Sequence, residues 1–289
     1  MEVTPRQASE NVLYFSKFHA AGNDFVLVDG INHPRTPSWW HHETIYKLCH
    51  RHYGIGGDGL IVLLDSKDSD YRMKYFNADG HEAEMCGNGL RCLALFIRDQ
   101  GHSVSTPMSI ETLSGQVSVE IMADGLVKVA MPPISFARAN IPMRGDGECI
   151  NDDLKIDKNL TLKITALSIG NPHVVLFGDY GDEQFYELGP MISVYHAFPE
   201  GANVHFVKVE GMDTIVQRVW ERGVGPTLAC GSGAVAAVAA GIANNLLPFN
   251  AKIRVKQPGG ELSVAVADGY RESTLEGEAV YVYHGVVEF

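Results

Sequence analysis

An internal repeat restricts the fold of this chain more than any other feature of its sequence. The segment around Cys86, MCGNGLRCLALFI, has the same layout as the segment around Cys230, ACGSGAVAAVAAGI, which lies 144 residues further on. Four more pairs keep the same order at offsets of 144 to 148 residues: Gly22 and Gly170, Gly57 and Gly201, Asn77 and Glu221, and Gly115 and Gly260. Ordered matches near one offset are typical of a duplicated unit. The sequence therefore predicts two homologous halves.

Alternation of apolar and polar residues predicts that each half is mostly β. The predicted strands cover residues 25–29, 60–64, 73–76, 117–121, 127–131, 204–209 and 280–283. Residues 90–98 and 234–244, directly after the two cysteine motifs, are apolar on all sides and lack β-branched dominance, so they are predicted as buried helices. We expect an α+β fold with two homologous β-rich lobes, each a sheet barrel around a central helix, related by a pseudo-two-fold axis.

Two prolines mark the expected boundary between the lobes, because Pro132 and Pro133 would end the strand that reaches Met131. The N-terminal lobe would then cover residues 1–133 with the first cysteine, and the C-terminal lobe residues 134–278 with the second. The last strand, 279–289, lies beyond the second repeat and is a candidate to return to the first lobe.

Charge and cysteine usage limit the class of function. A net charge of -12 and a pI near 5.4 provide no basic stripe for nucleic acid or for anionic lipid. We find no secretory signal in the first dozen residues and no run of about 18 apolar residues, so we expect a soluble protein with no membrane partner. Five cysteines, an odd number, favour a reducing compartment, the cytoplasm, over a disulfide scaffold.

Each repeated cysteine precedes a glycine-rich step and a predicted helix, which places its sulfur at a helix N-terminus. Unpaired N–H groups and the positive end of the helix dipole favour a thiolate there. Glycine-flanked amides can also bind a carboxylate closely. Cys49, Cys92 and Cys149 lack this context and a counterpart in the other half, so we interpret them as packing residues.

Two matched thiols suit one class of reaction. Inversion of a carbon stereocentre removes a proton from one face and delivers another to the opposite face, which requires a pair of acid–base groups. Helix amides that hold the substrate carboxylate would stabilise the developing enediolate charge. The sequence therefore predicts a cofactor-independent amino-acid epimerase in which Cys86 and Cys230 meet at one cleft.

Six longer motifs point to a family. They are AAGNDF (20–25), GIGGDG (54–59), FNADG.EAEMCGNG.RC (76–92), GNPH (170–173), GANV.F (201–206) and ERG.G.T.ACGSGA (221–234). Together they resemble the diaminopimelate epimerase family along nearly the whole chain. The resemblance implies lobes that close over the substrate and interconversion of LL- and meso-2,6-diaminopimelate in lysine and peptidoglycan-precursor biosynthesis. It implies no pyridoxal phosphate, and we expect no other cofactor and no metal.

The resemblance also implies roles for individual residues. Cys86 and Cys230 match the catalytic pair. The backbone donors to the reacting carboxylate would be Gly87, Asn88, Gly231 and Ser232. The residues that hold the substrate, several of them at its distal amino-acid end, would be Asn23, Asn77, Asn171, Asn203, Glu221 and Arg222. His173 would have an auxiliary role only.

Some positions depart from the family pattern. Pro226 stands where an acidic residue is common, Gly59 where some members have glutamine, and Ala20-Ala21 in place of Gly-Leu. Pro226 removes a charge and a backbone donor four residues before Cys230, so it bears on substrate preference rather than on the type of reaction.

Several alternatives remain open at this level. A proline or hydroxyproline racemase would share the cysteine pair. Glu221 and Arg222, which would bind the second amino-acid group of a long substrate, favour diaminopimelate instead. A thiol redox protein is less favoured because C-x-x-C is absent, and a metal site at residues 49–52 lacks a second ligand pair. A binding module would clasp an amino acid without reacting. The expected partners are a small amino-acid substrate and, since family members often pair, a second copy of the chain.

Overall fold

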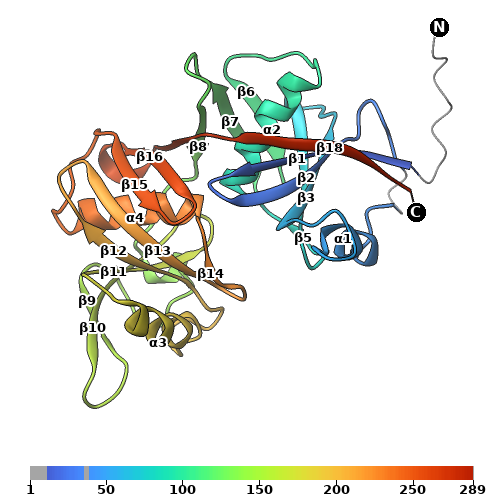
Figure 1. Cartoon of the computed structure of the whole chain (residues 1–289). Coiled ribbons are helices and arrows are strands. Elements are labelled where there is room, and N and C mark those ends of the chain that lie inside the picture. The colour runs from blue at the N-terminus through green and yellow to red at the C-terminus, as the bar shows by residue number, and fades with distance from the viewer. Residues whose placement is uncertain (1–11, 36–38, 289) are drawn as a thin grey trace, which may run out of the picture. The chain divides into compact units, whose positions relative to one another are not determined.

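The computed structural model describes residues 12–35 and 39–288 (Figure 1). These residues form two compact units. The first unit runs to Ile121 and includes the C-terminal stretch from Ala279, and the second covers Met122–Glu278. The expected boundary near residue 133 lies one strand further along the chain. The difference arises because β8 (Val127–Met131) pairs along its whole length with β17 (Ser273–Gly277) of the second unit.

The first unit is built on one mixed sheet with the strand order β18–β1–β2–β3–β4–β6–β7. Its strands are β1 (Val12–Ala20), β2 (Asn23–Asp29), β3 (Gly59–Leu64), β4 (Tyr71–Asn77), β5 (Glu82–Ala83), β6 (Met108–Thr112), β7 (Gly115–Ile121) and β18 (Val280–Glu288). The pairs β2–β3 and β4–β6 are parallel. Parallel neighbours need a crossover connection, and α1 (His42–Cys49) and α2 (Gly87–Asp99) lie in these two connections.

The second unit has the strand order β9–β10–β11–β12–β13–β15–β16–β17–β8. The new strands are β9 (Asp152–Lys155), β10 (Thr161–Ser168), β11 (Pro172–Phe177), β12 (Asn203–Val209), β13 (Thr214–Glu221), β14 (Gly225–Thr227), β15 (Ile253–Gln257) and β16 (Gly260–Val266). The helices are α3 (Asp182–Ser193) and α4 (Gly231–Ala243), with short 3-10 turns at Arg138–Asn140 and Asp268–Tyr270.

Strand pairing repeats between the units. From β1 to β7, successive pairs are antiparallel, parallel, antiparallel and, after the second helix, parallel and antiparallel again. From β10 to β16 the same order recurs. Every strand predicted from alternation lies within an observed strand. The α+β class is therefore confirmed, with a curled mixed sheet in each unit.

The two helices predicted after the cysteine motifs are present, and both are buried. In α2 the residues from Gly87 to Ile97 are buried, and in α4 nearly all residues from Gly231 to Ile242 are. Each helix packs against strands of its own unit, α2 on β1, β2, β3 and β7, and α4 on β10 to β13, β16 and β17. These contacts remove both helices from water, as their apolar composition predicts.

Two further helices were not predicted from the sequence. Only Ile45, Leu48 and Cys49 are buried in α1, which is otherwise polar and eight residues long. In α3, Gly189 and Pro190 interrupt the pattern, although Phe185, Leu188 and Ile192 keep helical spacing and enter the core of the second unit. Within the described residues, the structure contains no helix long and apolar enough to cross a bilayer.

Candidate active site

Cys86 begins α2 as its N-cap residue. Its backbone is extended (φ -138°, ψ 115°), and its sulfur accepts a hydrogen bond from the backbone N–H of Gly89 at 3.4 Å. The residue is partly exposed. Because the first N–H groups of a helix have no partner within the helix, this position favours a thiolate.

Cys230 begins α4 in the same way. Its backbone has φ -130° and ψ 115°, and its sulfur accepts from the N–H of Gly233 at 3.3 Å. The hydroxyl of Ser232 lies 3.6 Å from the sulfur. Two bonds with Gln257 hold the cysteine backbone, since Cys230 N donates to Oε1 at 2.7 Å and Nε2 donates to the Cys230 carbonyl at 3.3 Å. The sequence motif did not point to Gln257, because it lies 27 residues further on.

The remaining cysteines lie in the cores of the units. Cys49, Cys92 and Cys149 are buried thiols. Burial raises the pKa of Cys49 to about 12 and raises the pKa values of Cys92 and Cys149 as well. A thiol in this state is a poor acid–base group at neutral pH. Cys230 is also buried, with 8% of its surface exposed, but it caps a helix as Cys86 does, and the other three cysteines do not.

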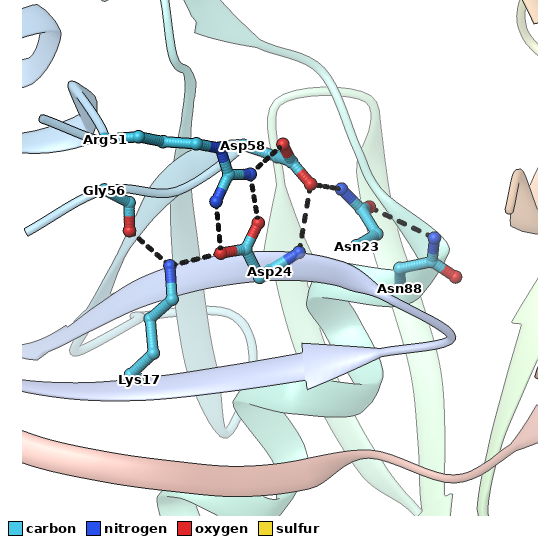
Figure 2. Close-up of polar contacts among 7 residues, drawn as sticks. All are labelled: Lys17, Asn23, Asp24, Arg51, Gly56, Asp58 and Asn88. Atoms are coloured by element: carbon cyan, nitrogen blue, oxygen red, sulfur yellow. Dashed lines mark hydrogen bonds and ion pairs between the residues drawn. The ribbon is translucent and has the colours of Figure 1, made fainter. Parts of the chain in front are cut away.

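A polar network surrounds Asn23 in the first unit (Figure 2). Asn23 Nδ2 donates to Asp58 Oδ2 at 2.9 Å, and Asn23 Oδ1 accepts from Asn88 Nδ2 at 3.1 Å. The sulfur of Cys86 is 3.8 Å from the same Oδ1. The structure therefore brings together three residues that the sequence assigned to the site: Asn23, Cys86 and Asn88.

Ion pairs connect this network to Asp24, Lys17 and Arg51. Asp24 binds both Lys17, at 2.6 Å, and Arg51, at 2.6 and 3.0 Å, while Arg51 also donates to Asp58 Oδ1 at 2.7 Å (Figure 2). Lys17 also donates to the Gly56 carbonyl. Burial by itself would raise the pKa of Asp24, but hydrogen bonds from Arg51 and Lys17 outweigh it and hold this pKa well below its ordinary value.

Substituting Asp24 by asparagine should destabilise the fold by about 3 kcal/mol at pH 7, because it leaves the buried Lys17 ammonium without a carboxylate. The folded pKa of Asp24 lies below that of the unfolded chain, so its contribution is present above about pH 4 and decreases as the pH falls further. Urea denaturation at pH 7 and at pH 3 should show a smaller difference at pH 3. The exposed pair Glu43–Lys47 supplies the control, since Glu43→Gln should change nothing measurable.

Asn88 is almost fully enclosed, and its side chain is engaged on both sides. Its Oδ1 accepts from Arg91 NH2 at 2.8 Å, and its Nδ2 donates to Asn23. Arg91, a fully buried arginine of α2, also donates to the Gly87 carbonyl at 3.3 Å. The side chain of Asn88 therefore serves the network, and its backbone N–H is the group suited to a ligand.

A chain of buried polar groups runs through the second unit. His173 Nε2 lies 2.7 Å from Asn171 Oδ1, and His173 Nδ1 lies 2.8 Å from His205 Nε2. Gln217 Nε2 lies 2.8 Å from His205 Nδ1 and donates to the Gly233 carbonyl at 2.9 Å. Burial lowers the pKa of His173 to about 3 and that of His205 well below its ordinary value, so both rings are neutral. His205 and Gln217 were not predicted.

The other predicted substrate residues lie at strand ends. Asn77 Oδ1 accepts from the Tyr75 hydroxyl at 2.8 Å. Asn203 accepts from the Arg222 backbone N–H at 3.0 Å and donates to the Pro172 carbonyl at 3.1 Å. Glu221 accepts from the Thr227 hydroxyl at 2.5 Å, and the exposed guanidinium of Arg222 donates to the Glu200 carbonyl at 3.1 Å.

Two departures from the family pattern have structural explanations. A Cβ at Gly59 would lie 2.5 Å from the Phe76 carbonyl oxygen, so a side chain cannot occupy this position without a backbone shift. Pro226 is exposed in the short edge strand β14, opposite Trp220, where a missing N–H is tolerated.

Residues 49–52, the cluster considered as a metal site, make ordinary hydrogen bonds. Within it, His50 Nδ1 accepts from the N–H groups of His52 and Tyr53. Among the residues that the structure describes, no three His, Cys, Asp or Glu side chains form a metal-binding group.

Comparison with known proteins identifies the family of this chain. A family model described as diaminopimelate epimerase matches residues 15–137 and 165–282. A diaminopimelate epimerase of Desulforudis audaxviator is 40% identical over 277 residues, covering 94% of this chain and 98% of that protein. One of Heliobacterium modesticaldum is 39% identical over 278 residues, with coverage of 94% and 98%.

A solved structure extends the comparison to the fold. A hydroxyproline epimerase from Agrobacterium vitis superposes with a TM-score of 0.70 at 13% identity, covering 96% of this chain and 91% of that one. At this identity the likeness concerns the fold alone, and it confirms the two-lobed α+β architecture. The family model spans most of both units and the relatives match over nearly their full length, so the chain belongs to the diaminopimelate epimerase family.

Proposed function

We propose that this protein is a diaminopimelate epimerase, which interconverts LL- and meso-2,6-diaminopimelate without pyridoxal phosphate. The observation that carries the proposal is that two cysteines, Cys86 and Cys230, cap two repeat-related helices with nearly the same backbone geometry. Family membership supplies the substrate, and the paired caps supply the acid and the base. The alternative amino-acid racemases share only the fold at 13 to 14% identity.

The reaction needs one thiolate and one thiol. The thiolate removes the α-proton from one face of the substrate carbon, and the thiol of the other cysteine delivers a proton to the opposite face. The two sulfurs exchange their protonation states in each turnover. Because both must remain reduced, the activity requires a reducing compartment such as the cytoplasm.

The backbone at each helix start supports the intermediate. Negative charge that leaves the α-carbon moves onto the carboxylate oxygens, and the N–H groups of Gly87, Asn88, Gly231 and Ser232 are the proposed donors to them. Preorganised donors of this kind often make the largest single contribution to such reactions. Asn23, Asn77, Asn171, Asn203, Glu221 and Arg222 hold the rest of the substrate, and His173 acts through Asn171.

Isotope exchange tests the function directly. Incubation with LL-diaminopimelate in deuterated water should produce the meso isomer with deuterium at the inverted α-carbon, which NMR and mass spectrometry detect. L-Proline and trans-4-hydroxy-L-proline serve as controls and should retain their α-protons. A protein that binds diaminopimelate without exchange would be a binding module, and exchange into proline instead would assign the racemase alternative.

We also propose that the protein forms a homodimer through β18. This strand pairs only with β1 among the described strands (Figure 1), and its exposed side chains include Val280, Tyr281, Val282, Tyr283 and Val286. An unprotected apolar edge strand is a template for pairing with a second chain.

Sedimentation tests this dimer and should give twice the chain mass of 31.6 kDa. Val282→Lys should shift the protein toward the monomer, and a monomeric wild type would contradict the proposal.

A further inference from the structure

Asn23 and Asn171 occupy equivalent places in the two repeats. Each follows a glycine with positive φ, Gly22 at 79° and Gly170 at 84°, at the turn of a β-hairpin. The two side chains nevertheless bind different partners. The partner of each amide group determines whether its oxygen or its nitrogen remains available to a ligand.

In the first unit a carboxylate sets the direction. Asp58 Oδ2 also accepts from the Asp24 backbone N–H, and a carboxylate oxygen is an acceptor, so the contact of 2.9 Å to Asn23 comes from the amide nitrogen (Figure 2). Arg51 and the Asp24 backbone N–H, at 2.7 and 3.1 Å, hold the Asp58 carboxylate in place. The oxygen of Asn23 then points the other way, where it accepts from Asn88 Nδ2 at 3.1 Å and keeps a second lone pair for a ligand. Asn23 thus presents an acceptor.

In the second unit a backbone carbonyl sets the direction. The Gly233 oxygen can only accept, so the group 2.9 Å away is the Gln217 amide nitrogen. This nitrogen also faces His205 Nδ1, which must therefore accept, and the ring proton of His205 lies on Nε2. His205 Nε2 donates to His173 Nδ1, and His173 Nε2 donates to Asn171 Oδ1. Asn171 thus uses its oxygen internally and presents its amide nitrogen as a donor.

The hydrogen bonds that link these buried polar groups can run in one direction only. Reversing it would require the Gln217 oxygen to face His205 and the Gly233 carbonyl, which places two acceptors against each other. A protonated ring at either histidine would place two donors against each other, and burial already lowers both pKa values. Three buried side chains and one backbone carbonyl together fix the direction of every hydrogen bond in this series. They therefore determine the orientation of the Asn171 amide without contacting a ligand themselves.

The fold itself does not require this polar chain. In the parallel strand pair of the first unit, Ile61 lies opposite Leu27. In the matching strand pair of the second unit, His205 lies opposite Val175. At the 144-residue offset Met73 corresponds to Gln217, and Ile61 and Met73 both pack against Gly89 as His205 packs against Gly233. One unit thus fills this place with apolar side chains. Buried polar groups carry a desolvation cost that apolar ones do not, so their presence in the second unit serves another purpose.

We propose that Asp58 in the first unit, and His205 with Gln217 in the second, are positioning residues that hold two equivalent asparagines in opposite polarity. Asn23 offers an oxygen to an ammonium group, and Asn171 offers N–H groups to a carboxylate. These opposite polarities match the opposite charges of the ammonium and carboxylate groups of an amino acid. The inference rests on the proposed function for the identity of the ligand, but the orientations can be tested without turnover.

Histidine tautomers provide that test. In the full chain labelled with ¹⁵N-histidine, long-range ¹H–¹⁵N correlation at pH 7 should show His173 and His205 as neutral rings with the proton on Nε2. Single substitutions of each histidine assign the signals. Either ring with its proton on Nδ1, or charged, would overturn the inference whether or not the protein is an epimerase.

The chain supplies a matched variant for the second unit. The double substitution His205→Ile with Gln217→Met copies the pair that the first unit packs at the same place, so the fold should persist. His173 should lose its single tautomer, and the KM for LL-diaminopimelate should rise about tenfold while kcat changes less than about threefold. A variant with an unchanged KM and an unchanged His173 tautomer would overturn the role of the pair.

Asp58 is tested separately. Asp58→Leu removes the acceptor and should raise the KM about tenfold, whereas Asp58→Asn retains an oxygen for Asn23 and should restore it to within about threefold of the wild type. Arg51 keeps its two bonds to Asp24 in both variants. Equal KM values for the leucine variant and the wild type would remove Asp58 from the proposal. If wild-type turnover is absent while the tautomers are as stated, the proposed function fails and the polarity stands.

Discussion

Replacing Cys230 by alanine is expected to lower kcat for epimerisation by a factor of about 10³ or more, because one of the two acid–base groups is lost and inversion has no partner on that face. Cys86→Ala should have an effect of the same size. The double variant should be hardly worse than either single variant, since the two thiols act as a unit. Deuterium incorporation with formation of the second isomer measures all three variants.

The control for this prediction lies within α2. Cys92→Ala removes a thiol from the same helix, but this thiol is fully buried and burial raises its pKa. The variant should lose some stability through the small cavity while it keeps most of its activity. Circular dichroism confirms folding in each case. A Cys86→Ala or Cys230→Ala variant that retains a tenth of the wild-type rate would refute the two-cysteine mechanism.

Gly233→Ala is expected to cost about 3 kcal/mol of stability and to lower activity about 100-fold. A Cβ there would lie 2.2 Å from His205 Cε1 and 3.1 Å from the Cys230 sulfur. The His205 ring cannot move away, because it is fully buried and bound on both sides by His173 and Gln217. The start of α4 must therefore shift, and overpacking of this kind commonly costs 1–3 kcal/mol, while a misplacement of about 1 Å at a reacting group reduces rates about 100-fold.

The repeat supplies the matched control, Gly89→Ala. The Cβ added at that position would lie 2.9 Å from Ile61 Cδ1 and 3.0 Å from Met73 Cε, which are the flexible ends of two side chains. These ends can move, and alanine also favours a helix over glycine by about 1 kcal/mol, so the net change should be small. Urea denaturation and turnover measure both variants. Equal losses for the two glycines would show that the rigidity of His205 does not matter.

Much of the architecture could be predicted because it follows from local patterns. Alternation identified strands such as β3 and β12, and the apolar composition of residues 90–98 and 234–244 identified the two buried helices. The helix-capping place of each cysteine followed from the glycine-rich step before these helices. The short, polar α1 and the proline-containing α3 escaped prediction because their burial depends on only a few side chains each.

The supporting residues of the site could not be predicted in this way. Asp58 lies 35 residues from Asn23, and His205 lies 32 residues from His173. Neither residue has a local signal, since an aspartate between glycines suggests a turn and a histidine in an apolar strand suggests packing. Gln217 and Gln257 likewise acquire their roles only when β13 and β15 come beside the start of α4.

The sequence by itself determined the duplication, the α+β class and the two cysteines at helix starts, because periodicity and capping are properties of neighbouring residues. Only the tertiary structure decided which atoms of Asn23 and Asn171 face outward. An asparagine side chain has one acceptor end and one donor end of almost the same shape, so its direction follows from fixed partners that the folded chain brings to it. Those partners are a carboxylate in one unit and a backbone carbonyl, relayed through three side chains, in the other.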